Sequence, residues 1–317
     1  MKKKLAVHFT DSKKTNYAYE RLLLCQHCGT YSIRMQDECE ECGKTSRLTP
    51  IQQVAHAWSQ RKGQSSLLFL GILLCLAIIS AQTLPSLIGS IIGSIVLFGV
   101  AFSLQKQLAR YERSVHFRRF LYAERGKIRL ALMRELDEIA VDMKEGNPKT
   151  AYEKLREVSH FLNNDPIKRR KIACLNQFVL RSDMELELDT LVPSSYDYQF
   201  VEYLRKVAQV KRSLIKKKVL DYAVAYKNEI LRHENGTEIL ANVAGAALRM
   251  KAYVDDYYEF ILEFLEYLSK ERLLRLAKLA STYRTEWAEL YARTEALVQA
   301  RYSFDPDFKG IFQRGSA

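Results

Sequence analysis

Three patterns of apolar residues divide this 317-residue chain. Short apolar or alternating stretches flank a group of cysteines at residues 22–48, which favours short strands. An almost unbroken apolar run follows at residues 67–104. Beyond it, apolar residues recur at steps of three and four, the period of one helix face. Together the patterns predict a mainly α-helical protein with a small strand-containing segment near the N-terminus.

The apolar run at residues 67–104 is too long for one membrane-spanning helix, which needs roughly 20 residues. Gln82, Thr83, Pro85 and Ser86 interrupt it, and Pro85 suits the first turn of a new helix. We therefore expect a transmembrane hairpin within residues 63–105, with spans near 66–82 and 85–104. A shallow re-entrant hairpin and a buried soluble hairpin are the alternatives. Small residues in the second span would suit packing against the first span or a homodimer contact.

The distribution of charge gives the expected hairpin an orientation. Residues 65–105 carry no charged side chain, whereas the chain as a whole has 49 Lys and Arg against 37 Asp and Glu, a net charge of +12. Basic residues flank the run on both sides, which places both flanks and both termini in the cytoplasm of a multi-pass cell-membrane protein. We expect the basic collar after the second span to contact membrane lipid. The collar consists of Lys106, Arg110, Arg113, Arg118 and Arg119.

Four cysteines form the clearest chemical motif. Cys25 and Cys28 make one CxxC pair, Cys39 and Cys42 make a second, and a Gly follows each pair. Four thiolates at this spacing can close a tetrahedral site, and a closed all-cysteine site is typical of structural zinc. Iron in the same sulfur geometry is the alternative. Because about fifty residues bury little core, the metal would supply most of the folding energy of residues 1–62.

The pattern CxxCG, nine residues, CxxCG resembles the short zinc-ribbon family of bacterial membrane-tethered proteins over residues 22–47. The resemblance implies zinc ligation by the four cysteines. Members of that family often carry Pro inside the knuckle, where this chain has Gln26-His27 and Glu40-Glu41. We expect His27 to face solvent. Of the two remaining cysteines, Cys75 and Cys174, we expect both to be inert packing residues.

After the membrane hairpin we expect an almost entirely helical chain. Turn signals at residues 146–148 and 163–166 delimit short helices in a juxtamembrane region, 106–195. Residues 196–303 contain sustained three-four spacing, which predicts long helices of about 45 Å in an antiparallel bundle or a coiled coil. A register shift at residues 269–271 is compatible with a turn or a kink. The predicted organisation is a zinc-ribbon domain at 1–62, the hairpin at 63–105, these two helical regions, and a tail at 304–317.

The sequence carries no motif that names a reaction. Phosphate-loop, dinucleotide-binding, nucleophile-elbow and zinc-protease patterns are absent, and the six His are scattered. We therefore expect a non-enzymatic, membrane-anchored scaffold that binds partner proteins through the ribbon and the bundle. A membrane-tethered nucleic-acid binder and an auxiliary subunit of a membrane transporter or enzyme complex are the alternatives. The basic residues for nucleic acid would be Lys211, Arg212, Lys216, Lys217, Lys218 and the run 168–171.

Overall fold

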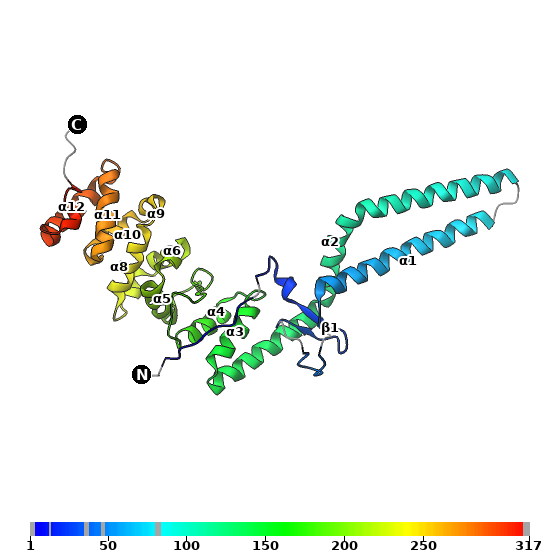
Figure 1. The fold of residues 1–317 in the computed structure, drawn as a ribbon, viewed down its shortest axis with the longest axis horizontal. Coiled ribbons are helices and arrows are strands. Elements are labelled where there is room, and N and C mark those ends of the chain that lie inside the picture. The colour runs from blue at the N-terminus through cyan, green and yellow to red at the C-terminus, as the bar shows by residue number, and fades with distance from the viewer. Residues whose placement is uncertain (1–3, 13, 35–37, 46–47, 80–83, 313–317) are drawn as a thin grey trace. The chain divides into compact units, whose positions relative to one another are not determined.

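The computed structural model describes residues 4–12, 14–34, 38–45, 48–79 and 84–312. Its fold is mainly helical with one three-stranded sheet (Figure 1). The chain forms two compact units. We call the one that comprises Asp11–Gly146 and Arg156–Phe161 the ribbon unit. The helical unit comprises Met1–Thr10, Asn147–Leu155 and Leu162–Ala317.

The sheet of the ribbon unit is antiparallel and has the order β2-β1-β3. Its strands are β1 (Leu23–Cys25), β2 (Tyr31–Ser32) and β3 (Leu48–Pro50), preceded by a 3-10 turn at Ala18–Arg21. Leu24 pairs with Tyr31 on one side and with Thr49 on the other. Tyr31, Ile33 and Ile51 are buried beneath it. The predicted short strands around the cysteines are therefore present.

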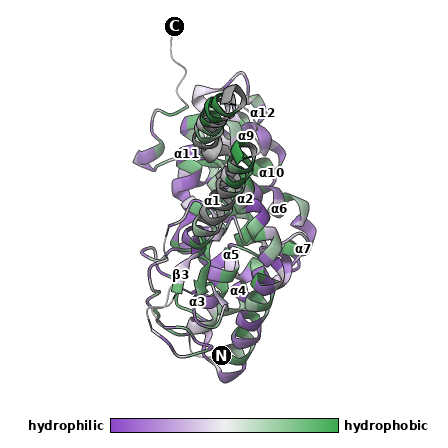
Figure 2. Ribbon diagram, turned by 90° about the vertical axis from the view of Figure 1, so that its right-hand side faces the viewer, coloured by the Kyte–Doolittle hydropathy of each residue, from purple (hydrophilic) through white to green (hydrophobic). Residues whose placement is uncertain are grey.

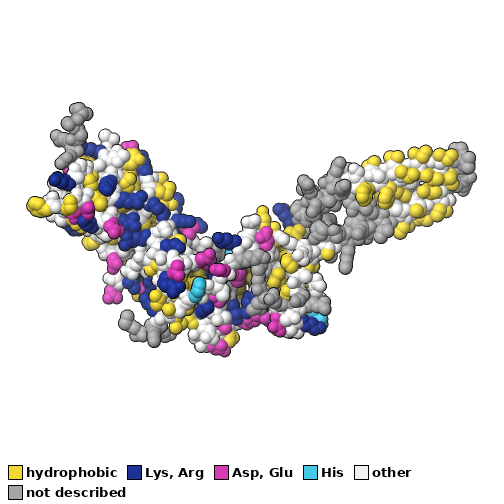
Figure 3. All heavy atoms as spheres, viewed as in Figure 1, with side chains coloured by type: hydrophobic (Ala, Val, Ile, Leu, Met, Phe, Trp, Pro, Cys, Tyr) yellow, Lys and Arg dark blue, Asp and Glu magenta, His cyan; other side chains and the backbone are white. Residues whose placement is uncertain are grey.

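Two helices continue the ribbon unit, α1 (Ile51–Ile79) and α2 (Leu84–Glu145). They lie side by side along α1 and the first part of α2 (Figure 1). Large apolar side chains are exposed along this pair, among them Phe69, Ile72 and Ile95 (Figure 3). Helix α2 ends where the sequence predicts, because Gly146 adopts a positive φ of 81° that favours glycine.

The expected transmembrane hairpin is wrong. Within the described residues, no helix combines the length and the apolar composition needed to cross a membrane. The apolar residues instead belong to longer helices: α1 begins at the buried Ile51 and passes through Arg61 and Lys62, and α2 continues into the charged residues 106–145. The turn predicted at residues 82–83 lies outside the described residues. The expected location, a multi-pass membrane protein with cytoplasmic termini, depended on this hairpin and is therefore also wrong.

The expected contact between the basic collar and lipid depended on the second transmembrane span, which the structure does not support. Arg118 and Arg119 are exposed on α2. The structure does not describe the side chains of Lys106, Arg110 and Arg113. The collar is thus described only as part of the charged length of α2.

The helical unit consists of short helices joined by turns (Figure 1). Each carries hydrophilic and hydrophobic residues, and the hydrophobic ones supply the core (Figure 2). Asn164 caps α4 by accepting a hydrogen bond from the Ile167 amide, with Pro166 in its first turn. The helices are α3 (Pro148–Val158), which ends in the ribbon unit, α4 (Asp165–Leu175), α5 (Tyr198–Val210), α6 (Lys217–Ala225), α7 (Lys227–Leu231), α8 (Gly236–Ala247), α9 (Lys251–Asp256), α10 (Tyr258–Glu263), α11 (Lys270–Thr282) and α12 (Ala288–Tyr302).

The expected long helices of residues 196–303 are also corrected. Most residues of the predicted apolar seam at 240–268 are buried, but they come from α8, α9, α10 and the turns next to these helices. Met250 breaks the seam, because its backbone is extended (φ −134°, ψ 138°) and its side chain is 48% exposed. The register shift at residues 269–271 is a turn, since Ser269 is extended immediately before α11. The region is a packed array of short helices rather than a coiled coil.

Candidate metal centre

The two CxxC pairs fold into turns with the same hydrogen bonds. The Gly29 amide donates to the Cys25 carbonyl at 2.9 Å, and the Gly43 amide donates to the Cys39 carbonyl at 2.7 Å. Both glycines have positive φ, 73° and 64°, a conformation that costs other residues about 1 kcal/mol or more. The amides of Cys25 and Cys39 close each turn on a carbonyl five residues later. Local sequence therefore builds each CxxCG into a tight turn of the kind that can hold a metal ion.

The two knuckles bring the four sulfurs together. The Sγ atoms of Cys25, Cys28, Cys39 and Cys42 all lie within 4.8 Å of one another. The Cys25–Cys42 sulfurs are 3.8 Å apart and the Cys28–Cys39 sulfurs 3.6 Å apart. Four sulfurs at about 2.3 Å from one tetrahedral ion would lie about 3.8 Å from one another. The predicted ligands thus form a cluster that fits a metal ion with four thiolates and no open position.

Hydrogen bonding and burial act differently on the two knuckles. Thr30 Oγ1 lies 3.3 Å from the Cys28 sulfur, and this contact, helped by the Thr30 amide, lowers the pKa of Cys28 to about 6. Burial raises the pKa of Cys39 to about 12, although the amides of Cys42 and Glu41 oppose it. Hydrogen bonds to a sulfur favour its thiolate form. A bound cation would favour the thiolate at all four positions, because metal ligation deprotonates a coordinating thiol.

The second knuckle is tied to α2 by ion pairs that the sequence analysis missed. Arg34 lies 2.9 Å from Glu135 and 2.7 Å from Glu40, and it also pairs with Glu138. Glu41 pairs with Arg134 of α2. The charges were visible in the sequence, but their pairing was not, because about a hundred residues separate Arg34 from Glu135.

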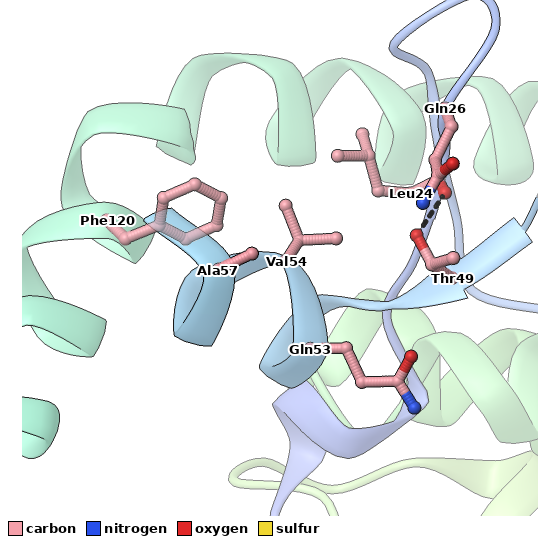
Figure 4. Close-up of a pocket in the computed structure, with 7 residues that line it drawn as sticks. All are labelled: Leu24, Gln26, Thr49, Gln53, Val54, Ala57 and Phe120. Atoms are coloured by element: carbon pink, nitrogen blue, oxygen red, sulfur yellow. Dashed lines mark hydrogen bonds between the residues drawn. The ribbon is translucent and has the colours of Figure 1, made fainter. Parts of the chain in front are cut away.

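The first knuckle borders a pocket of about 310 Å³ in the ribbon unit (Figure 4). Its apolar lining comes from three elements, β1, α1 and α2, whereas two glutamines and a threonine supply its polar groups. Thr49 Oγ1 donates to the Leu24 carbonyl at 3.2 Å, which fixes the hydroxyl at the pocket. No charged side chain is among the described residues that line it. They are Leu24, Gln26, Thr49, Gln53, Val54, Ala57 and Phe120.

The other cysteine and histidine positions that the sequence analysis named do not belong to the four-sulfur cluster. His27 is exposed between two ligands, as expected. Cys174 is buried, and burial raises its pKa to about 12, which agrees with an inert packing residue. Cys75 is exposed on α1, so its assignment as a packing residue is wrong. The apolar neighbours of Cys75 in the sequence suggested burial, but this side of α1 is not covered.

Of the two basic clusters, the run at 168–171 is used inside the helical unit. Lys171 is 1% exposed and lies 2.7 Å from Glu187. Arg169 pairs with Asp197 at 3.1 Å, and Lys168 donates to the Val192 carbonyl at 2.8 Å. Three of the four cations are thus held by partners within the unit.

Comparisons of this chain with protein-family models, with curated proteins and with solved structures found no match. The resemblance over residues 22–47 is therefore supported only by the four-cysteine cluster itself. That cluster is compatible with a zinc-ribbon-like site.

Proposed function

We propose that this chain is a zinc-dependent adaptor, whose ribbon unit binds a partner protein and catalyses no reaction. The observation that carries the proposal is the closed four-sulfur cluster. Zinc sites that act on substrates keep a position open for water, whereas four cysteine ligands leave none. The ion would therefore shape a surface rather than supply a reaction. We propose zinc over iron because zinc is the usual ion of closed four-cysteine sites.

The surface that the ion would shape contains the pocket at the first knuckle. Gln26 lies between the ligands Cys25 and Cys28, so loss of the ion would release one wall of the pocket. Helix α2 contributes Phe120 to the opposite side, and the Arg34 ion pairs hold that helix against the ribbon (Figure 4). Ribbon, α1 and α2 would together present one rigid docking site.

The occupant that this pocket fits is an uncharged segment of a partner polypeptide that inserts one large apolar side chain. The volume of about 310 Å³ lies at the lower end of the range for drug-sized ligands. Leu24, Val54 and Phe120 offer apolar contact. Gln26 and Gln53 carry amides that can pair with a peptide backbone. With no charged lining residue among those described, a charged side chain would lose its solvation without a partner.

Site-specific photo-crosslinking tests this proposal, because α1 offers a matched control. Gln52 and Gln53 are adjacent and both exposed, but only Gln53 lines the pocket. A photoreactive residue at position 53 of the full chain, expressed in its own cells, should give one defined adduct that position 52 does not give. The adduct should be lost in Ala57→Arg, which fills the pocket, and kept in Gln52→Arg.

Metal dependence provides the second half of the test. The same adduct should disappear when Cys25 and Cys28 are both replaced by Ser, and binding of the purified partner should require the metal-loaded chain. Equal adducts at positions 52 and 53, or binding that survives in the double Ser variant, would refute the adaptor proposal. Turnover of a substrate that depends on the ribbon unit would refute its non-catalytic part.

A further inference from the structure

A basic groove lies along α11 in the helical unit, far in sequence from the cysteines. It has a volume of about 560 Å³. Its cations are Arg272, Arg275 and Lys278, and the single acidic side chain among its described lining residues is Glu271. We call it the arginine groove. The lining residues are Glu271, Arg272, Leu274, Arg275, Lys278, Leu279 and Thr282.

Two of the arginines at this groove are held by neutral acceptors. Arg275 donates to the carbonyls of Leu248 and Arg249, at 2.8 and 3.1 Å. Arg249 donates to the carbonyls of Ser213 and Ile215. Its positive charge also disfavours the charged form of Arg272. Carbonyl oxygens at helix ends fix a guanidinium in place without cancelling its charge. The positive charge is therefore positioned but not neutralised.

Arg272 lies at the centre of this charge. Among the described contacts, no hydrogen bond or ion pair is found for its guanidinium. Its stem crosses Gly245, where a Cβ would lie 3.1 Å from Arg272 Cγ. The pKa of Arg272 is lowered, first by burial and then by the neighbouring Arg212, Arg275 and Arg249. A half-buried guanidinium with unused donors is a strong receptor for an anion that can accept two hydrogen bonds.

The arginine groove differs in this respect from the other basic clusters. In the run at 168–171, Arg169 and Lys171 form ion pairs with Asp197 and Glu187. Lys217 and Lys218 also meet carboxylates. The three cations that line the groove and the neighbouring Arg212 and Arg249 are accompanied by one acidic residue among the described lining residues, Glu271, which lies 3.9 Å from Arg212. The five cations are Arg212, Arg249, Arg272, Arg275 and Lys278.

We propose that the arginine groove binds the phosphate backbone of single-stranded nucleic acid. Phosphodiester oxygens accept the paired hydrogen bonds that a guanidinium donates. A chain with one negative charge per nucleotide matches cations spread along a helix, whereas a lone phosphate would leave several of them unpaired. Leu274 and Leu279 line the same groove and offer an apolar surface to a sugar or an unstacked base. The proposal is independent of the adaptor function, because it concerns the helical unit.

Fluorescence anisotropy with labelled single-stranded DNA and RNA oligonucleotides of about twelve nucleotides tests the proposal on the full chain. Binding should weaken with salt, with a slope of log K against log salt of about −0.7 for each phosphate neutralised. At 0.1 M salt, each lost contact should therefore cost roughly fivefold in affinity. Arg272→Gln and Lys278→Gln should each cause such a loss and make the slope shallower by about 0.7.

Arg293→Gln is the matched control, because it removes one positive charge from an exposed side chain of α12 that pairs with Glu289. Its affinity should stay within twofold of the unaltered chain. Absent binding, binding that salt does not weaken, or an equal loss in Arg293→Gln would overturn the proposal. Binding to vesicles of anionic lipid is measured as well. Binding to vesicles that depends on Arg272 and Lys278, with no binding to oligonucleotides, would also overturn it.

Discussion

Replacing Gly236 with Ala should destabilise the helical unit, although alanine is the better helix former. Gly236 is buried at the start of α8. A Cβ there would lie 2.1 Å from the carbonyl oxygen of Ile230 and 2.8 Å from Leu231 Cα. Both are backbone atoms, so no side-chain rotation relieves the overlap and α7 must move away from α8. Overpacking costs about 1–3 kcal/mol, and we expect the upper end because backbone must move.

Part of that cost is offset, because Gly→Ala lowers the entropy of the unfolded chain by about 0.4–1 kcal/mol. The net loss of unfolding free energy is then about 2 kcal/mol. Urea unfolding should show a lower midpoint with an unchanged slope. The fluorescence of Trp287, which is 2% exposed in the helical unit, would report it in a Trp58→Phe background.

Gly126→Ala is the control for this prediction, since Gly126 lies within α2 and a Cβ there meets nothing within 4 Å. This change should stabilise α2 by about 0.5–1 kcal/mol, the usual gain on replacing an interior helical glycine. Circular dichroism would follow its unfolding. An unfolding free energy of Gly236→Ala within 0.5 kcal/mol of the unaltered chain would show that the α7–α8 junction relaxes freely, which contradicts the steric argument.

Three further predictions concern the ribbon unit and the cysteines. The purified chain should bind one metal ion per chain through four thiolates. The Cys39→Ser variant should lose the ion and the ribbon structure, while the fluorescence of Trp287 in the helical unit stays unchanged. Metal that is retained in this variant would contradict the proposed site. In the metal-loaded chain, whose four clustered thiolates are ligated, iodoacetamide should alkylate the exposed Cys75 before Cys174. Burial raises the pKa of Cys174 to about 12, so at pH 8 almost no thiolate is present there; peptide mass spectrometry would detect the opposite order. Arg34→Ala should lower stability by about 2 kcal/mol because it leaves the buried Glu135 without its partner, whereas Arg134→Ala breaks a half-exposed pair and should cost under about 1 kcal/mol; equal losses in thermal unfolding would contradict this ranking.

Features set by a few neighbouring residues could be predicted from the sequence. The knuckles need only CxxCG, because turn, glycine and sulfur positions lie within five residues. The same holds for the end of α2 at Gly146 and for the start of α4 after Asn164. Each of these signals works through the local backbone, with no knowledge of distant contacts.

Features that depend on distant contacts could not be predicted. The apolar seam at 240–268 correctly marked most of the buried positions, but nothing in its spacing shows that Met250 is extended and exposed. Helices that fold back on one another bury the same face as one long helix, so periodicity does not distinguish the two arrangements. The apolar run at 67–104 misled in a related way, because run length alone does not show where α1 and α2 begin and end.

The ion pairs between the ribbon and α2 also explain how this chain can tolerate acidic knuckle residues beside a candidate metal site. A divalent ion with four thiolates carries a formal charge of about −2. The second knuckle adds Glu40 and Glu41, which on their own would make the cluster more negative and oppose binding of four thiolates. Arg34 and Arg134 meet these two carboxylates and offset their charge. Arg34 also contacts Glu135 of α2. The same arginine therefore offsets the charge of an acidic knuckle residue at the candidate metal site and fixes α2 to the ribbon.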